Sequence, residues 1–428
     1  MRPSFQPRRE VSVISQLSHG GHRLLFLPSC ARQLHNKQQL RTMAAAADPI
    51  SNSTSTTPTT STTTNIISSL SELPPLPSYP AILLDQFGVL HDGFMPYAGS
   101  VEATRYLAET QKRKILLLSN SSRRAVHALN KLSALGFRRE WFFGAVTSGE
   151  VAHRLLEARK RREERGDKGE DAAASASASA IVLDERGAPL DVSLLGNKCF
   201  HITWGARGAV SVDGLGLELV SDPVEADFIL AHGTEAIGSS SGSSSPIELD
   251  ALREILEQSA KKQKKKETAI PLLCANPDIV TVNGAAGLVT MPGTLARWYG
   301  DAGGRVVLLG KPGPAIYSAA AALLKGNEKD EKNEKPASVS SSSSFPLLAI
   351  GDSLEHDIAG ASGAPCASGV DSLFIGGGIH AEELAVVVGG GAGGGATEQV
   401  LDAGALERLL ADRPGRQRPT LAMSWYRV

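Results

Sequence analysis

Four polar residues each follow a short apolar run of the sequence, directly or after one glycine. They are Asp85 after residues 81–84, Ser119 after residues 115–118, Lys311 after residues 306–309 and Asp352 after residues 347–350. Two carboxylates can hold one divalent cation through oxygen, and Mg²⁺ leaves its remaining positions to water and phosphate. A carboxylate can also attack phosphorus, and a lysine ammonium can neutralise phosphoryl oxygens. These residue types together predict phosphoryl transfer.

Each of these residues has an expected role. We expect Asp85 to be a nucleophile that forms an aspartyl-phosphate, and Lys311 to hold it ionised. The Ser119 hydroxyl and the backbone amides of Asn120 and Ser121 could donate hydrogen bonds to a phosphoryl oxygen. A strand-terminal Asp or Ser more often caps the following helix. Four such residues in order, each closing an apolar run, favour the chemical interpretation.

The apolar runs must form the elements that bring these residues together. Short, continuous apolar segments bounded by turn residues are typical of strands buried on both faces of a parallel sheet. Helical patterns follow them, for example at residues 100–111 and 314–324. Alternating strands and helices predict a doubly wound, Rossmann-like α/β fold. In such folds the site lies just beyond the carboxyl ends of the strands, where the four polar residues would meet.

Four motifs resemble, in the same order, those of the haloacid dehalogenase (HAD) superfamily. They are residues 85–93 (DQFGVLHDG), 119–123 (SNSSR), 310–312 (GKP) and 351–357 (GDSLEHD). Residues 377–384 and 419–423 also look like a branch of class IIA, loosely related to NagD-type phosphatases. The resemblance extends from residue 77 to residue 428. It implies a Mg²⁺-dependent phosphatase with metal ligands from Asp85, the backbone carbonyl of Phe87, Asp352 and Asp357.

The long interval between the second and third motifs predicts a separate domain. From Ser119 to Lys311 the chain runs for 192 positions, and over a hundred of them lie outside low-complexity sequence, which is enough for a domain. Strand-like segments recur there at residues 180–183, 200–204, 228–230 and 272–274. This placement resembles the C2-type α/β cap of class IIA. The expected division is a core of residues 77–147 and 296–428, with the cap at residues 148–295.

Residues 274–278 (CANPD) resemble the turn where such a cap returns toward the core. On that resemblance Asn276 and Asp278 are candidate phosphate-site residues. Asn-Pro-Asp is also a good turn sequence in any protein, so a purely structural turn stays open. For His201 and Trp204, which fall in a predicted strand, packing in the cap is the expected role.

Phe87 departs from the family pattern. Most hydrolases that the motifs resemble carry an aspartate there, which protonates the leaving oxygen and later activates water. A phenyl ring can do neither, and losing a general acid costs about 10²–10⁴-fold in rate. Three explanations are open: substrates with good leaving groups such as acyl or aryl phosphates, proton donation by His91, Asp92 or a cap residue, and a protein that only binds a phosphorylated ligand or a partner.

The N-terminal segment looks like a targeting sequence. Residues 1–47 contain six Arg and one Lys against a single acid, Glu10, which is typical of a mitochondrial or chloroplast transit peptide. Residues 51–64 are almost entirely Ser and Thr and predict a linker, so residues 1–76 are expected to lie outside the fold. We expect a mitochondrial protein. The alternatives are a chloroplast protein, or a cytoplasmic protein if translation starts at Met43.

Five internal low-complexity segments are expected to be loop insertions, at residues 157–180, 238–245, 261–266, 325–344 and 389–395.

The composition and spacing of residues argue against several other classes of protein. A net charge of −1 gives no basic excess for nucleic acid, and no apolar run approaches the roughly 18 residues of a membrane span. The four cysteines are widely spaced and form no CxxC pair, which favours isolated thiols over a zinc site or a disulfide framework. No Gly-x-Gly-x-x-Gly follows the first strand, which argues against a nicotinamide enzyme. The expected partner is a small phosphorylated metabolite, and a homodimer is an open alternative to a monomer.

Overall fold

The structure is a computed structural model. It describes residues 64–165, 181–205, 207–240, 242–263, 270–282, 288–326, 346–365, 369–386, 401–413 and 417–428. The predicted targeting segment, most of the predicted linker, Cys30, Cys366 and the glycine-rich residues 389–395 lie outside these ranges. In the described part, no helix is both long enough and apolar enough to span a bilayer.

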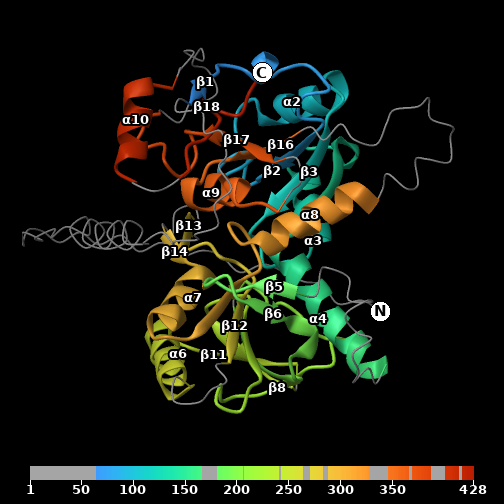
Figure 1. Ribbon diagram of the computed structural model, residues 1–428, viewed down its shortest axis with the longest axis vertical. Helices are drawn as coiled ribbons and strands as arrows, with labels where there is room; N and C mark the ends of the chain where they lie inside the picture. The colour runs from blue at the N-terminus through green and yellow to red at the C-terminus, as the bar shows by residue number, and fades with distance from the viewer. Residues whose placement is uncertain are drawn as a thin grey trace, which may run out of the picture. The chain divides into compact units, whose positions relative to one another are not determined.

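The first sheet has seven strands, and every pairing between neighbours is parallel. Its order is β1-β18-β17-β16-β2-β3-β4 (Figure 1). The strands are β1 (Asn65–Ile66), β2 (Ala81–Leu84), β3 (Lys114–Ser119), β4 (Phe142–Thr147), β16 (Leu347–Gly351), β17 (Val370–Ile375) and β18 (Leu421–Met423). We call this sheet with its helices the core. It confirms the predicted doubly wound α/β fold.

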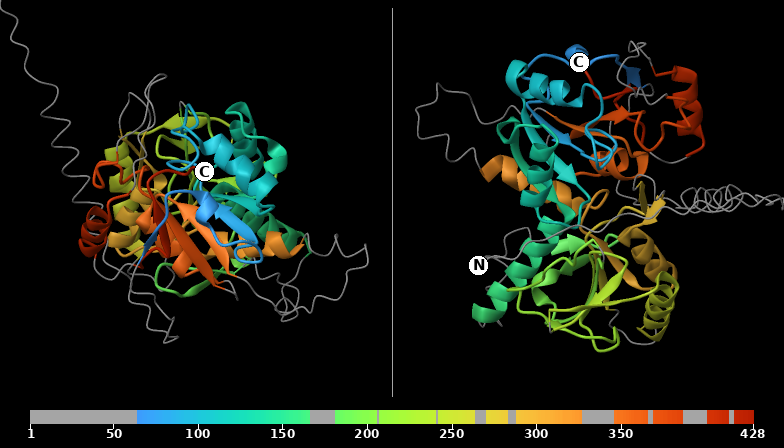
Figure 2. Two further views of the ribbon diagram at one scale, coloured as in Figure 1. Left: turned by 90° about the horizontal axis from the view of Figure 1, so that it is seen from above. Right: turned by 180° about the vertical axis from the view of Figure 1, so that it is seen from behind.

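The central strands are buried on both faces, as their continuous apolar sequences predict. In β2, Ile82 and Leu84 pack with α2 (Ser100–Arg105) and α3 (Ala125–Ala134). Leu83 faces the other way and packs with α8 (Pro314–Gly326). Successive side chains of a strand point to opposite faces, so each run needs apolar residues at every position. The three helices lie on the two sides of the sheet in Figure 2.

Strand order reverses at the centre of the core sheet. From β2 the chain proceeds outward to β3 and β4, whereas β16 pairs with the other side of β2 and continues outward to β17 and β18. The carboxyl ends of β2 and β16 therefore flank the switch point, where open α/β sheets bind ligands. Asp85 follows β2 and Asp352 follows β16, so both carboxylates are delivered to this point.

The predicted cap forms a second, mixed sheet of order β11-β10-β7-β9-β12-β15, with β8 paired to β7. Its strands are β7 (Lys198–Thr203), β8 (Glu218–Leu219), β9 (Phe228–Ala231), β10 (Ala236–Gly238), β11 (Ser244–Pro246), β12 (Pro271–Cys274) and β15 (Arg305–Leu308). Two short hairpins accompany it, β5 (Ile181–Leu183) with β6 (Pro189–Asp191), and β13 (Val280–Val282) with β14 (Leu288–Thr290). The helices α6 (Leu249–Gln263) and α7 (Pro292–Asp301) pack on one face of this sheet.

One strand lies in a different sheet from the one expected. Residues 306–309 were predicted to lie in the core sheet, but β15 pairs in parallel with β12 of the second sheet, Val306 opposite Leu272. The predicted cap boundary at residue 295 also falls inside α7, which packs on the second sheet. An apolar run indicates a buried strand without saying which sheet receives it, so the cap extends to β15.

The folded part also begins earlier than residue 77. Strand β1 pairs with β18 at the edge of the core sheet, and the turn η1 (Leu70–Glu72) buries Leu70 completely. Four predicted insertions begin too early, because α4 (Ser148–Arg165), β10, α6 and α8 continue into them, and β11 also overlaps the end of the insertion at residues 238–245. The remaining helical elements are η2 (Tyr106–Thr110), η3 (Arg139–Trp141), η4 (Val192–Leu194), η7 (Leu354–Ile358), α9 (Ala359–Ser362) and α10 (Ala403–Ala411).

Candidate active site

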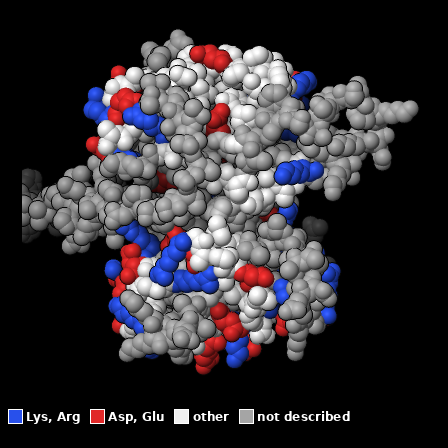
Figure 3. Space-filling view, viewed as in Figure 1, with Lys and Arg blue, Asp and Glu red and all other residues white. Residues whose placement is uncertain are grey.

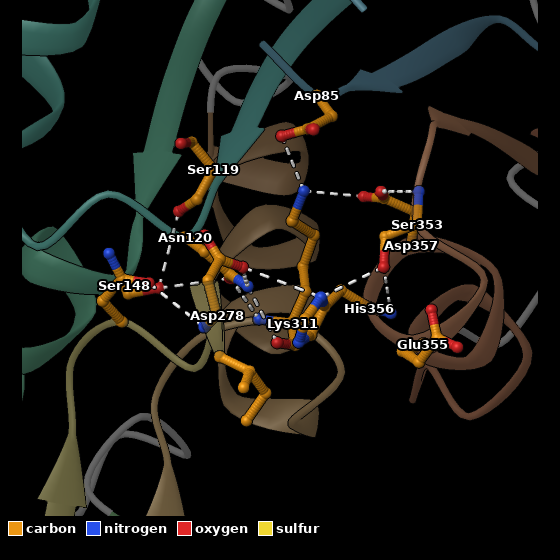
Figure 4. A network of polar contacts seen from close by, with 12 residues as sticks. Asp85, Ser119, Asn120, Ser148, Asp278, Lys311, Ser353, Glu355, His356 and Asp357 are labelled. Atoms are coloured by element: carbon orange, nitrogen blue, oxygen red, sulfur yellow. Dashed lines mark hydrogen bonds and ion pairs between the residues drawn. The ribbon is translucent and has the colours of Figure 1, made fainter. Parts of the chain in front are cut away.

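A buried lysine joins two carboxylates at the carboxyl edge of the core sheet. The Lys311 ammonium donates to Asp85 Oδ1 at 2.7 Å and to Asp357 Oδ1 at 2.6 Å (Figure 4). Lys311 follows β15, Asp85 follows β2, and Asp357 lies in η7 after β16. Two strands of the core and one of the cap therefore deliver the three side chains, and the predicted pairing of Lys311 with Asp85 is present.

A third carboxylate completes the cluster. One oxygen each of Asp85, Asp352 and Asp357 lies within 4.8 Å of those of the other two, and all three residues are buried. Asp352 is wedged against backbone, because a Cβ on Gly88 or Gly378 would come within 2.0 Å of its Oδ2. Gly88 also has a φ of +81°, which side chains rarely adopt. Both glycines are therefore needed to seat this carboxylate.

The electrostatics of the cluster favour a cation. Burial raises the pKa of Asp85 well above its usual range, although the Lys311 ammonium opposes that shift. Burial, followed by repulsion from Asp357, raises the pKa of Asp352 to about 7. Burial disfavours the charged form of Lys311, but Asp357 and Asp85 outweigh this and raise its pKa. Three carboxylates share one ammonium, so a divalent cation fits the excess negative charge.

Two carboxylate oxygens remain available for a ligand. Asp85 Oδ2 and Asp352 Oδ1 accept no hydrogen bond from the residues that the structure describes, whereas Asp352 Oδ2 accepts one from the Ile379 amide at 2.8 Å. Both oxygens of Asp357 are engaged, Oδ1 by Lys311 and Oδ2 by the Ser353 amide at 3.1 Å. Asp85 and Asp352 are therefore the better placed of the predicted metal ligands.

Asn120 fixes the backbone of Lys311. Its Oδ1 accepts from the Lys311 amide at 2.7 Å, and its Nδ2 donates to the Lys311 carbonyl at 3.0 Å and to Asp278 Oδ1 at 2.8 Å. Ser148 Oγ adds a longer hydrogen bond of 3.4 Å to Asn120 Oδ1. Figure 4 shows these contacts from β3, the start of α4 and the turn after β12. The predicted phosphate-site residue Asn120 thus has a positioning role for its side chain.

Replacing Asn120 should destabilise the fold as well as the site. Asn120→Ala leaves the buried Lys311 amide without its acceptor, and an unpaired buried donor costs about 1–3 kcal/mol. We expect the free energy of unfolding in urea to fall by that amount. The matched control is Asn130→Ala on the exposed face of α3, which should change stability by less than about 0.5 kcal/mol. Equal stability of the two variants would contradict the role given to Asn120.

The other predicted phosphate-site residues are already hydrogen-bonded within the protein. Ser119 Oγ accepts from Gln86 Nε2 at 2.5 Å and from the Ser121 amide at 3.2 Å. Asn276 Oδ1 accepts from the Asp278 amide at 3.1 Å, which is the turn-forming contact of an Asn-Pro-Asp sequence. Asp278 reaches the Asn120 network, and Asn276 shapes the turn that presents it. Phosphate contacts by these residues stay predictions.

The two sequence candidates for a replacement acid are poorly suited. Asp92 Oδ1 accepts from the amides of Phe94 and Met95, and these hydrogen bonds lower the pKa of Asp92, although its partial burial opposes the shift. Burial, with the Lys131 charge nearby, lowers the pKa of His91 to about 4, so His91 is neutral at physiological pH. Its Nδ1 accepts from the Gly93 amide at 2.9 Å. Asp92 shapes a turn and His91 packs edge-on to Phe87 at 4.5 Å between ring centroids.

Several site residues were not found from the sequence. Gln86, Ser148 and Ser353 hold Ser119, Asn120 and Asp357 respectively. Gln86 and Ser353 each directly follow a predicted residue, which is the signal that could have found them. Ser148 begins a helix far along the chain, and its contact depends on the packing of β4 beside β3.

Comparisons with known proteins show what the sequence and the fold resemble. Residues 82–183 match the sequence model of the haloacid dehalogenase-like hydrolases. No curated protein sequence matches significantly. A solved structure described as a possible sugar phosphatase of the HAD superfamily, from Cytophaga hutchinsonii, is similar at 16% identity over 86% of this chain and 99% of that one, with a TM-score of 0.51.

Two other solved structures are similar. One is a haloacid dehalogenase-like hydrolase from Brucella suis, at 26% identity over 81% of this chain and 95% of that one, with a TM-score of 0.49. The other is a glycerol phosphate phosphatase from Mycobacterium tuberculosis in complex with magnesium, at 19% identity over 81% and 76%, with a TM-score of 0.43. Residues 82–183 are therefore similar in sequence to haloacid dehalogenase-like hydrolases, and the chain shares its fold with the Cytophaga hutchinsonii structure.

Proposed function

We propose that the protein is a Mg²⁺-dependent phosphohydrolase that transfers a phosphoryl group from a small metabolite to Asp85. The observation that carries the proposal is the Lys311 ammonium between Asp85 and Asp357, beside the buried carboxylate of Asp352. A nucleophilic carboxylate, a neutralising ammonium and a candidate cation site lie in one cluster. Phosphoryl transfer depends mainly on positioning and charge neutralisation, which this cluster supplies.

The candidate metal ligands are Asp85, the Phe87 carbonyl, Asp352 and Asp357, the last directly or through water. A bound Mg²⁺ would supply charge neutralisation at the phosphoryl oxygens. In the proposed reaction, Asp85 attacks phosphorus with one oxygen and the leaving oxygen departs on the opposite side. Lys311 favours the ionised form of Asp85 and neutralises the phosphoryl charge, and water then hydrolyses the aspartyl-phosphate.

Phe87 restricts which substrates would react well. Its ring cannot protonate a leaving oxygen, so an alcohol of high pKa would leave slowly. Phosphates with good leaving groups, such as aryl or acyl phosphates, need little protonation. We therefore propose a substrate of this kind and slow turnover of simple alkyl phosphates.

Metal dependence tests the proposal directly. With p-nitrophenyl phosphate we expect phosphate release in Mg²⁺ and none in excess chelator, with recovery when Mg²⁺ is restored. Mg²⁺ should also raise the melting temperature at pH 7, because a ligand that binds only the folded state stabilises it. The folded-state pKa of Asp352, about 7, lies above its unfolded value, so this carboxylate costs the metal-free protein stability as pH rises from about 4 to about 7. Asp352→Asn should abolish the Mg²⁺ shift, and a shift that survives in this variant would contradict the proposed site.

A second candidate function is binding without turnover, and Phe87 is the observation that favours it. A protein that keeps Asp85, Lys311 and Asp352 but lacks the acid could hold a phosphorylated ligand. Calorimetry with p-nitrophenyl phosphate separates the two functions. Mg²⁺-dependent binding with no product over hours would establish the binding protein, and product release would establish the enzyme.

A further inference from the structure

Phe87 is an exposed aromatic residue two positions after Asp85. The chain leaves β2 through Asp85 and Gln86 and reaches a β-bridge between Phe87 and His91. In an extended backbone, residues two apart face the same side, which would put Phe87 beside Asp85 while Gln86 reaches Ser119. The Asp85 residue is 8% exposed and Phe87 is 38% exposed. The part of a substrate beyond its phosphoryl group would therefore meet the Phe87 ring.

A lysine lies on that ring. Lys131 belongs to α3, and its Nζ is 4.7 Å from the centroid of the Phe87 ring. The side chain is half-buried, and it forms no hydrogen bond or ion pair with any described residue. The nearby Asp92 has its Oδ1 committed to the amides of Phe94 and Met95. Among the described residues, the ammonium lies on the face of Phe87 and interacts electrostatically with Asp92, but it has no hydrogen-bond acceptor, so it is available to an incoming anion.

We propose that Lys131 receives the leaving oxygen of the substrate as an oxyanion, against the face of Phe87. This inference rests on the proposed phosphohydrolase function and assigns its substrate class. The substrates would be phosphates of phenols, enols or carboxylic acids, whose leaving groups spread negative charge over a planar group. Such a group can pack on an aromatic ring while its oxygen pairs with the ammonium.

The reaction needs no proton from the protein. An Asp85 oxygen bonds to phosphorus, the bond from phosphorus to the leaving oxygen breaks, and its electron pair stays on that oxygen. The resulting oxyanion pairs with Lys131 and takes a proton from water after release. A second water then attacks phosphorus, regenerates the Asp85 carboxylate and gives phosphate and a proton to solvent. Lys131 would stabilise the leaving oxygen through its charge. It would take the place of a general acid, which the Phe87 ring cannot supply.

The test is the dependence of kcat/KM on the leaving group. A series of ring-substituted phenyl phosphates is assayed in Mg²⁺ with the full chain and with Lys131→Gln, Lys131→Arg and Lys114→Gln. Lys114 is the matched control, because its Nζ also lies over a phenyl ring, 5.1 Å from the centroid of Phe143. Lys114 is the first residue of β3, at the opposite end of the strand from Ser119. Melting temperatures of the variants establish that each is folded.

Lys131→Gln should lose little with p-nitrophenyl phosphate and about 10²-fold with unsubstituted phenyl phosphate, since removing one oxyanion donor costs about 10²–10³-fold. The more basic the leaving oxygen, the more charge it holds locally and the more it needs the ammonium. Lys131→Arg should retain most of the activity, and Lys114→Gln should show no trend.

Two results are distinguishable as failures. If the unaltered protein hydrolyses the series and Lys131→Gln loses the same factor on every member, or none, the role of Lys131 is wrong and the phosphohydrolase stands. If the unaltered protein hydrolyses none of the esters in Mg²⁺, the proposed phosphohydrolase function is wrong, and the role of Lys131 is wrong as well.

Discussion

Asp85→Asn should reduce phosphate release by about 10⁴-fold or more, which is the scale expected when a covalent nucleophile is removed. The amide has nearly the same size and can still accept a hydrogen bond from Lys311, but it cannot attack phosphorus. Release from p-nitrophenyl phosphate in Mg²⁺, followed against time, measures the effect.

The same variant should not lose stability. Burial raises the pKa of Asp85 in the folded protein, so the ionised carboxylate costs the metal-free fold stability at neutral pH. A neutral amide removes that cost, and we expect an equal or higher melting temperature without metal. Asp250→Asn, on the exposed start of α6, is the control and should keep full activity. Activity of Asp85→Asn comparable with this control would show that another group is the nucleophile.

Phe87→Asp should increase the hydrolysis of alkyl phosphates. An aspartate there could protonate a leaving alcohol, and general acid catalysis contributes about 10²–10⁴-fold. We expect a gain of about 10²-fold in kcat/KM for an alkyl phosphate such as glycerol phosphate, and little change for p-nitrophenyl phosphate. The gain should be concentrated on poor leaving groups because only they need the proton.

The position can accept this change. Phe87 is 38% exposed and contacts the His91 ring and the Lys131 ammonium, so the loss of its partly exposed ring opens no deep cavity. Phe94→Asp is the matched control. Phe94 is 61% exposed on the turn after His91, and it has no role in the proposed reaction. A similar gain in Phe94→Asp, or an unchanged alkyl phosphate rate in Phe87→Asp, would contradict the explanation of slow turnover.

Much of the core could be predicted from the sequence because its strands are locally encoded. Residues 81–84 and 347–350 are apolar at every position and end in Asp85 and in Gly351-Asp352. Burial on both faces requires that pattern, and parallel pairing then brings the two strand ends to one edge. The meeting of Asp85 and Asp352 follows from these two facts alone.

The position of Lys311 required tertiary information. Its apolar run correctly predicted a strand, but β15 pairs with β12 of the cap sheet rather than with the core. Lys311 still reaches Asp85, because Asn120 of the core holds its backbone amide and carbonyl. A hydrogen-bond network across 191 positions of sequence leaves no local pattern to find.

Lys131 was missed for a similar reason. In the sequence it is one more basic residue on the polar side of an amphipathic helix, where most lysines are solvated. Only the packing of α3 beside the loop after β2 puts it on the Phe87 ring. Residues 65–73 were missed because a two-residue edge strand and a short turn carry too few apolar residues to be distinguished from the Ser/Thr-rich sequence before them.

The central claim is that Asp85 carries the phosphoryl group during turnover, and chemical trapping tests this claim most directly. Borohydride added during turnover of p-nitrophenyl phosphate in Mg²⁺ reduces an aspartyl-phosphate to homoserine, which peptide mass spectrometry locates in the sequence. The proposal predicts homoserine at position 85, absent without Mg²⁺ and absent in Asp85→Asn. Turnover that proceeds with residue 85 unmodified, or with homoserine at another position, would contradict it.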